Sequence, residues 1–514
     1  MTDDQNNYEY ALSLQKDGKY KTAIEVARKI SHPGARGGIF IDCGFGTRKP
    51  SLIREGILLF EGILEKGNSE ISKASLLYNI GNGYYSIYKL KQLKGGKVIP
   101  PNDDDLRSSK KAYRKALFET KDNPPNLHSQ IYVNYGNCLS ALGRSFEAIN
   151  AYNDALVLEP QNGMAAGNLG IELVKIANIT EKYRHHYLQA SSDLLTRSLS
   201  SEMHLSYGGI ETRRGMETRL NQIRLIIDAH KNGIEPLRKV NLSESKEHER
   251  NYLLFCLTNR LFLNVWAGDQ DVSPALTDEI GFGSLTTSVG DLETVPKLLQ
   301  ILNEIKEAFS AARYLYYLSQ TNSKELNSIS RFTSYFDFAV ETQHGLAIGL
   351  CKSAYTRSFD ILDKVARIVN YYFNIGNVRD SFWDVFAERQ SRGENHEMRF
   401  VARPSIISTK NYSLYGLSDL CIDYFESEHV DFKSIDTRRN LLTHDYLVVT
   451  NDSSEIKLTE NSITKEELYR QTLSVLHLAK YAILYVVCAV HISEDIKQTK
   501  GKTFSIKYKQ AWGN

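Results

Sequence analysis

The sequence lacks closely spaced cysteines and carries almost no net charge. Its six cysteines stand singly along 514 residues, and no two have the short spacing of a zinc site or a redox pair. We therefore expect buried free thiols in a reducing compartment. Lysine and arginine (63) barely exceed aspartate and glutamate (61). This balance leaves nucleic-acid binding undecided, because a local basic groove needs no net charge.

The chain also lacks a long apolar run and a secretion signal. Its most apolar stretch, residues 482–490 (AILYVVCAV), is far shorter than the ~20 residues of a membrane span. The first residues, MTDDQNNYEYALSLQ, have neither the basic nor the apolar region of a signal peptide. We expect residues 482–490 to form a buried core helix in a cytoplasmic protein with no membrane partner.

Only 11 prolines interrupt the chain, and helical periodicity dominates nearly throughout. Strand-like alternation is limited to Ile406-Ile407 and residues 502–508. The pattern predicts an all-α protein with three parts. These are a helical solenoid over residues 1–200, a helical connector with a long loop over 201–295, and a helical bundle over 296–514.

The clearest internal repeat covers residues 131–162 (IYVNYGNCLSALGRSFEAINAYNDALVLEPQN). Gly136 is small where two helices would cross, Gly143 lies at the turn between them, and Pro160 blocks continuation of the second helix. This unit resembles the tetratricopeptide repeat (TPR), a helix-turn-helix of about 34 residues. Fainter copies flank it, at residues 8–30, 76–120 and from 163 onward.

One such repeat cannot bury its own apolar face, so neighbouring repeats must stack. We therefore expect a TPR-like solenoid with a concave surface for an unidentified protein or peptide partner. The C-terminal part shows long apolar stripes at helical spacing, which predict a bundle. The expected helices cover residues 296–319, 336–373, 412–426, 437–449 and 465–492.

The segment Arg439-Asn440-Leu441-Leu442-Thr443-His444 holds a cation, an amide and an imidazole within about 1.5 helical turns. Asn440 and His444 are four residues apart and share a helix face. RNA carries its own nucleophile, the 2′-hydroxyl. Histidine suits proton transfer to or from it, because its reference pKa is about 6.5. Arginine suits the phosphate through paired hydrogen bonds, and asparagine can orient either partner.

One copy of this motif supplies one histidine, whereas RNA cleavage needs both a base and an acid. Two copies that face each other across a two-fold axis would supply both, and a two-fold dimer is the commonest oligomer. We therefore expect a homodimer with a composite site that contains Arg439, Asn440 and His444 from each protomer. This chemistry requires no metal and no cofactor.

The spacing by itself is weak evidence for catalysis. With 13 histidines in the chain, an arginine five or six residues before a histidine is expected about once by chance. Arg439 could be a surface arginine in an ion pair, and His444 an ordinary residue on a helix face. Asp363 and Lys364 could support the site from a neighbouring helix, or form an internal ion pair.

A family resemblance favours the catalytic interpretation. Residues 240–500 resemble HEPN domains, in particular a subfamily fused behind TPRs. HEPN families carry an arginine, usually a polar residue, three to five further residues and a histidine, an arrangement that Arg439, Asn440 and His444 fit. The resemblance implies a metal-independent endoribonuclease, frequently a toxin or an antiviral-defence protein. The matching stretches are YLLFCLTNRLFLN (252–264), LNEIKEAFSAARYLYY (302–317) and KSAYTRSFDILDKVARIVNYYF (352–373).

Two other functions fit the same sequence. Both halves could be interaction modules, with the HEPN-like bundle acting as a dimerisation scaffold or an antitoxin-type partner. The bundle could also accept a nucleotidyl group near Tyr446, which would need a separate transferase.

If the protein is an enzyme, we expect the solenoid to restrain or target the nuclease until a partner binds. Deleting residues 1–200 should then change cleavage or cell growth, and no change would count against this role.

Overall fold

The chain divides into two compact units, Met1–Ile234 and Glu235–Asn514. The segment 201–295, treated above as a connector, is therefore shared between the two units. The computed structural model describes residues 3–67, 71–95, 99–119, 124–178, 180, 183–200, 209–229, 236–264, 266, 272–278, 280–282, 285–287, 294–321, 323–336, 342–376, 378–392, 397–425, 435–451, 461–499 and 504–506.

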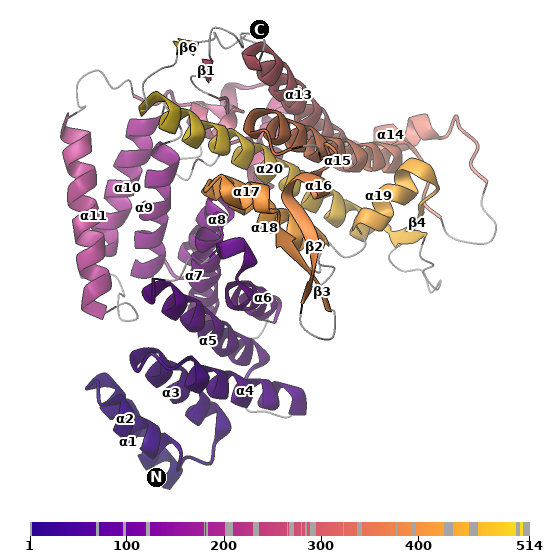
Figure 1. Ribbon diagram of the computed structural model, residues 1–514. Helices are drawn as coiled ribbons and strands as arrows, with labels where there is room; N and C mark the ends of the chain where they lie inside the picture. The colour runs from indigo at the N-terminus through magenta and orange to yellow at the C-terminus, as the bar shows by residue number, and fades with distance from the viewer. Residues whose placement is uncertain are drawn as a thin grey trace. The chain divides into compact units, whose positions relative to one another are not determined.

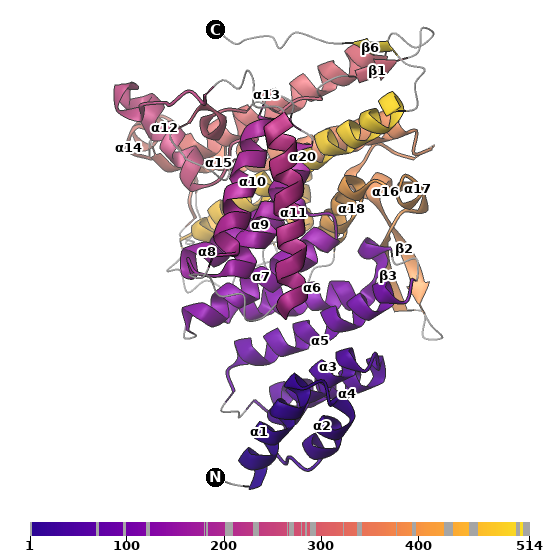
Figure 2. The same cartoon turned by 90° about the vertical axis from the view of Figure 1, so that its left-hand side faces the viewer.

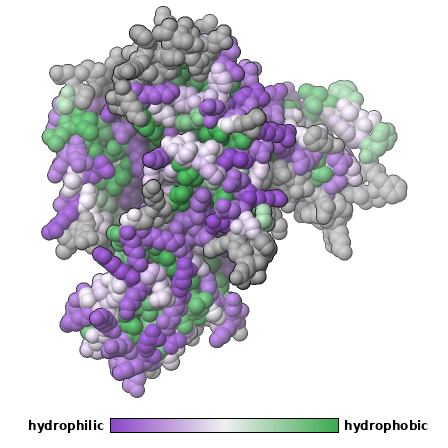
Figure 3. Space-filling view, in the orientation of Figure 1, coloured by the Kyte–Doolittle hydropathy of each residue, from purple (hydrophilic) through white to green (hydrophobic). Residues whose placement is uncertain are grey.

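The N-terminal unit is a series of helices in which consecutive pairs pack side by side (Figures 1 and 2). This arrangement confirms the expected helical solenoid. On the face seen in Figure 3, apolar residues form small patches between hydrophilic ones. The helices are α1 (Asp3–Lys16), α2 (Tyr20–Ala27), α3 (Pro33–Gly46), α4 (Pro50–Lys66), α5 (Lys73–Leu93), the 3-10 helix η1 (Pro100–Asn102), α6 (Asp104–Phe118), α7 (Pro125–Ala141), α8 (Ser145–Leu158), α9 (Gly163–Ala177), α10 (Arg184–Ser198) and α11 (Gly209–Ala229).

Two helix pairs, α5–α6 and α7–α8, share the same internal contact. The ring of Tyr152 lies against Gly136, and its hydroxyl donates a hydrogen bond to Oδ1 of the next residue, Asn137, at 2.9 Å. Tyr113 contacts Gly81 in the same way and donates to the asparagine that follows it, at 2.6 Å. Because both helix pairs contain this contact between a tyrosine, a glycine and an asparagine, the internal similarity in the sequence reflects one repeated helix-pair geometry.

The Gly136 contact gives a direct test of the repeat packing. A Cβ on Gly136 would lie 2.6 Å from the ring of Tyr152, whereas a Cβ on Gly62 would have nothing within 4 Å. Gly136→Ala is expected to destabilise the unit by about 1–3 kcal/mol, because the buried tyrosine must shift. Gly62→Ala, within α4, should stabilise it slightly through helix propensity. Hydrogen exchange of the α7 and α8 amides measures both; equal protection in the two variants would contradict this account.

The pair α3–α4 was not identified in the sequence. Glycines reduce the helix propensity of α3, but they allow its backbone to approach α4 closely. A Cβ on Gly56 would lie 2.7 Å from the carbonyl oxygen of Gly37. The glycines that weaken the sequence signal are therefore the residues that permit this packing.

The C-terminal unit is a helical bundle whose described residues also include three short two-stranded sheets. β2 and β3 form an antiparallel hairpin, β1 pairs antiparallel with β6, and β4 pairs parallel with β5. Its elements are η2 (Leu242–Glu244), α12 (Glu247–Thr258), η3 (Ser273–Leu276), β1 (Leu285–Thr287), α13 (Thr294–Thr321), α14 (Ser323–Ser330), α15 (Leu346–Phe373), α16 (Phe382–Phe386), β2 (Ala387–Arg392), β3 (Glu397–Ala402), α17 (Pro404–Ser408), α18 (Tyr412–Phe425), α19 (Ile435–His444), β4 (Val448–Thr450), β5 (Ser462–Thr464), α20 (Lys465–Thr499) and β6 (Phe504–Ile506).

Helix α20 forms the centre of this bundle and packs against α13, α15 and α18 (Figure 1). Residues 482–490 are buried throughout, as expected for a core helix. By length and composition alone, Lys465–Lys497 could cross a membrane, but 78% of its most apolar window is buried inside the protein. Two polar residues of α20 connect it to the segment after α12. His477 hydrogen-bonds the carbonyl oxygen of Asn259, and Lys480 donates to the carbonyl oxygen of Arg260.

Three local expectations were wrong. The expected helix over 336–373 begins only at Leu346, because residues 342–345 are not helical. Ile406-Ile407, expected to be strand-like, lies in the short helix α17, which begins at Pro404. The expected helix over 437–449 ends at His444, and the chain then enters the strand β4. The remaining strand-like stretch, 502–508, contains β6, within which residues 504–506 are described.

Candidate active site

All three predicted motif residues lie on α19, which packs against α15. Leu441 is buried and anchors α19, and Leu447 is buried just after the helix. Lys352 on α15 holds this following segment by donating to the carbonyl oxygen of Leu447 at 2.7 Å. Burial lowers the pKa of Lys352. The apolar spacing within the motif thus fixes α19 on the bundle and sets its polar residues at an edge.

Arg439 is held by two residues of α15. Its Nη2 donates to Oδ2 of Asp363 at 3.3 Å, and its guanidinium lies over the ring of Phe359, 5.7 Å from the centroid. The side chains of Arg439 and Asp363 are each about a third exposed (36% and 38%). A pair this exposed adds little stability. Its consequence is geometric, because it restrains an accessible guanidinium.

Asp363 has a second role that sequence reasoning could not reveal. Its Oδ1 accepts a hydrogen bond from the backbone N–H of Phe382, the first residue of α16, at 3.0 Å. The carboxylate therefore joins α15, α16 and α19. Lys364, the other supporting residue considered from the sequence, instead pairs with Glu304 on α13 at 3.2 Å. Asp363 therefore contacts the motif, whereas Lys364 forms an ion pair with a different helix.

A second acidic residue, Asp360, lies near the same arginine. Burial raises the pKa of its carboxyl group, and the charge of Arg439 partly opposes this rise. Arg439 thus stands among two carboxylates and a ring, all carried by successive turns of α15. This face of α15 orients the cation toward the edge of the bundle.

The neighbouring Arg438 has a different role. Its side chain is largely buried, and Nη1 lies 3.5 Å from Oε1 of Glu467 on α20. Glu467 is also bound by both Nε and Nη2 of Arg470, at 2.8 Å each. Burial lowers the pKa of Arg438. Of the two adjacent arginines, Arg438 anchors α19 in the bundle and Arg439 remains accessible.

Asn440 is exposed beside Arg439. His444 is the last residue of α19, four residues further along, so its Cα lies on the same helix face as that of Asn440. The side chain of His444 lies outside the described residues. The structure thus brings Arg439 to Asp363, leaves Asn440 accessible, and places the backbone of His444 one turn away.

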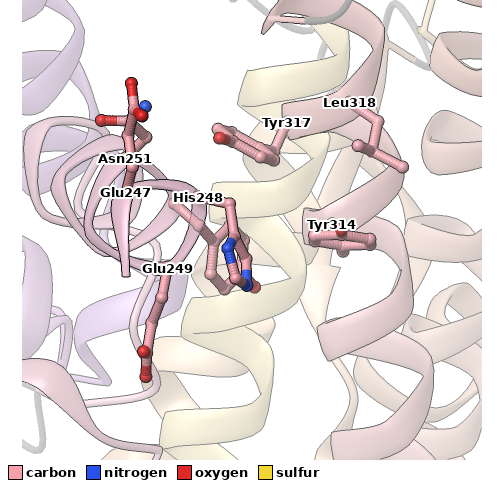
Figure 4. Close-up of a pocket in the computed structure, with 8 residues that line it drawn as sticks. Glu247, His248, Glu249, Asn251, Tyr314, Tyr317 and Leu318 are labelled. Atoms are coloured by element: carbon pink, nitrogen blue, oxygen red, sulfur yellow. The ribbon is translucent and has the colours of Figure 1, made fainter. Parts of the chain in front are cut away.

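A separate pocket of about 620 Å³ lies between α12 and α13 (Figure 4). His248 points into the gap opposite Tyr314 and Tyr317. None of the motif residues lines it, so this pocket is distinct from the candidate site. In the described part of the chain, no three histidine, cysteine or acidic side chains gather closely enough to hold a metal ion.

Comparison with known proteins identifies the C-terminal domain. Residues 289–493 match the family described as LA2681-like HEPN. No curated protein matches the chain. Among solved structures, a thermophilic TPR protein of Thermus thermophilus is similar at 12% identity; the alignment covers 43% of this chain and 99% of that one, with a TM-score of 0.31. Residues 289–493 thus match an LA2681-like HEPN domain, which contains the segment 439–444 and follows the helical solenoid of the N-terminal unit in the sequence.

Proposed function

We propose that the HEPN domain is a metal-independent endoribonuclease that cuts RNA by attack of its 2′-hydroxyl. The observation that carries this proposal is the accessible guanidinium of Arg439, held by Asp363 beside exposed Asn440 inside a HEPN domain. A fixed cation at an edge of the bundle fits the charge that builds on a phosphate during cleavage. His444, on the same helix face as Asn440, supplies the proton-transfer group.

In this reaction the 2′-oxygen forms a bond to phosphorus, and the bond from phosphorus to the 5′-oxygen breaks. A base takes the proton of the 2′-hydroxyl, and an acid gives a proton to the departing 5′-oxygen. The products are a 2′,3′-cyclic phosphate and a free 5′-hydroxyl. Arg439 donates hydrogen bonds to the phosphate oxygens, and Asn440 orients the phosphate or the histidine.

The base and the acid are two copies of His444, one from each protomer of a homodimer. A two-fold axis beside α19 brings both motifs to one phosphate without any further residue. The site is therefore incomplete in a single chain. The solenoid regulates or targets this activity by binding a protein or peptide partner, in a toxin or an antiviral-defence system in the cytoplasm.

The proposal is tested by incubating the purified full-length protein with total RNA in EDTA. RNA fragments in the absence of free divalent metal support an endoribonuclease. Intact RNA, under conditions in which the protein is folded, contradicts it and favours a scaffold or antitoxin-type role. A covalent nucleotide on exposed Tyr446, found after incubation with a nucleotidyltransferase, would instead favour the acceptor role.

The role of Asp363 in holding Arg439 gives a further prediction. Asp363→Asn keeps an oxygen for the Phe382 N–H but removes the charge that restrains the guanidinium. Cleavage is expected to slow by about 10- to 100-fold, since a misplacement of about 1 Å can cost that much. Stability should change little, because both side chains of the pair are partly exposed to solvent.

Single-turnover rates and urea midpoints of the two variants Asp363→Asn and Lys364→Met measure this effect. Lys364→Met is the matched control. Lys364 follows Asp363 on α15, and the substitution removes its ion pair with Glu304 on α13. It should cleave at the wild-type rate. If Asp363→Asn also cleaves at that rate, Arg439 does not depend on Asp363.

A further inference from the structure

The β2–β3 hairpin interrupts the helices of the C-terminal unit. Its base is buried, at Ala387, Val401 and Ala402, and contacts α18. Further along the hairpin, Arg389 is exposed and Met398 is 58% exposed. Figure 1 shows the two strands extending past α16, α17 and α18 of the same unit. The hairpin therefore has a buried base and an exposed end.

One face of the hairpin carries a cluster of rings and a cation. Arg389 and Phe400 are opposite each other in the strand register, so they share a face, and the guanidinium lies 5.5 Å from the ring centroid. Met398 lies on the same face, two residues before Phe400. Trp383 of α16 packs edge-on against Phe400, with centroids 4.9 Å apart. We call these four residues the aromatic platform.

The aromatic platform is joined to the candidate active site through α16. Trp383 follows Phe382, whose backbone N–H donates to Asp363 at 3.0 Å, and Asp363 accepts from Arg439 at 3.3 Å. One carboxylate thus fixes both the start of the helix that carries Trp383 and the guanidinium of the motif. The aromatic platform and Arg439 are parts of one connected structure within the HEPN domain.

The charge of the hairpin also favours a particular ligand. Residues 387–403 hold four arginines and three glutamates, so the hairpin carries a small excess of positive charge. Arg403 and Glu388 pair with each other at 3.8 Å. The exposed guanidinium of Arg389 attracts phosphate, and its flat surface and the neighbouring rings offer stacking surfaces to a base. Single-stranded RNA combines these two features, because its unpaired bases are free to stack on protein side chains.

We propose that the aromatic platform binds an unpaired base of the RNA strand that the 439–444 motif cuts. This inference rests on the proposed function for its biological meaning. Stacking on Phe400, Trp383 and Arg389 makes the enzyme select single-stranded segments and holds the strand near the phosphate-binding Arg439. It tolerates different bases, because every base has a stacking face.

The test measures binding without cleavage. The full-length protein is titrated in EDTA with a fluorescent single-stranded oligonucleotide that is 2′-O-methylated at every position, so that no 2′-hydroxyl can attack. Phe400→Leu, which keeps an apolar side chain but removes the ring, should weaken binding by roughly tenfold. Arg389→Gln should also weaken it and reduce the slope of log affinity against log salt by about 0.7, whereas Phe400→Leu should leave that slope unchanged.

The matched control is a second arginine–phenylalanine pair in the same unit. Arg331 lies 5.1 Å from the ring centroid of Phe332, just after α14, and both are exposed. Phe332→Leu should bind as the wild type does, and a duplex of the same sequence should be insensitive to Phe400→Leu. Arg389→Gln alters only an exposed side chain, so it keeps the test decisive if Phe400→Leu fails to fold.

Three results would overturn the platform: no binding by the wild type, unchanged affinity of Phe400→Leu and Arg389→Gln, or equal weakening by Phe332→Leu. These outcomes are independent of the cleavage assay. A wild type that cleaves RNA while the platform variants bind normally overturns only the platform. A wild type that binds through the platform but leaves natural RNA intact overturns only the proposed nuclease activity.

Discussion

His444→Ala is expected to slow RNA cleavage by roughly 10²- to 10⁴-fold, the range that general acid–base catalysis by a positioned side chain contributes. In the proposed dimer the substitution removes both the base and the acid, so the effect should lie toward the upper end of that range. Folding should be unaffected, because residue 444 ends α19 and the anchoring residues are Leu441 and Arg438. Single-turnover cleavage of a defined RNA in EDTA measures the rate.

A matched control is His248→Ala, which removes an exposed histidine of the pocket between α12 and α13. It should cleave at the wild-type rate. Mixed dimers test the composite site further. Adding excess His444→Ala protein to the wild type should lower activity beyond simple dilution, since a mixed dimer has one histidine. If His444→Ala cleaves RNA at the wild-type rate, the proposed mechanism is wrong.

Arg313→Met is expected to lower the free energy of unfolding of the C-terminal unit by about 3–5 kcal/mol. Arg313 on α13 is 4% exposed and binds both oxygens of Asp278, at 3.0 and 2.8 Å. It also donates to the carbonyl oxygen of Leu261 and to the hydroxyl of Tyr252. Removing the guanidinium leaves the mostly buried carboxylate of Asp278 and the carbonyl oxygen of Leu261 without these donors. The resulting loss of stability is far larger than that from breaking an exposed ion pair.

Urea unfolding followed by tryptophan fluorescence measures this effect selectively, because all three tryptophans lie in the C-terminal unit, at positions 266, 383 and 512. The solvent-accessible pair of Lys364 and Glu304, whose side chains are 30% and 62% exposed, is the control, and Lys364→Met should change stability by about 1 kcal/mol or less. The double variant Arg313→Met/Asp278→Leu should be more stable than Arg313→Met, since no buried charge is left unpaired. An Arg313→Met midpoint equal to that of Lys364→Met would contradict this account.

The elements with strong local signals were predictable from the sequence. Helices α13, α18 and α20 start within two residues of the expected positions, because long apolar stripes at helical spacing specify both the helix and its buried face. The repeat at 131–162 was found for a similar reason. Gly136 and Gly143 mark a close crossing and a turn, and Gly143 has the positive φ of 85° that such a turn uses.

The features that sequence missed depend on distant partners. Nothing local distinguishes the β4 segment from a continued helix; it becomes a strand because Val449 pairs with Ile463, beyond the end of the motif helix. The β2–β3 hairpin is polar and weakly patterned, so its strand pairing was not detected. Asp363 could be placed on a helix, but its contact with Arg439 spans 76 residues and appears only when α15 and α19 pack.

The most direct test of the central claim is the chemistry of the ends that the wild-type protein leaves on RNA in EDTA. Attack by the 2′-hydroxyl, assisted by Arg439 and His444, predicts fragments with 2′,3′-cyclic phosphates and 5′-hydroxyls. Fragments that carry 3′-hydroxyls and 5′-phosphates, or the absence of any fragments, would contradict it.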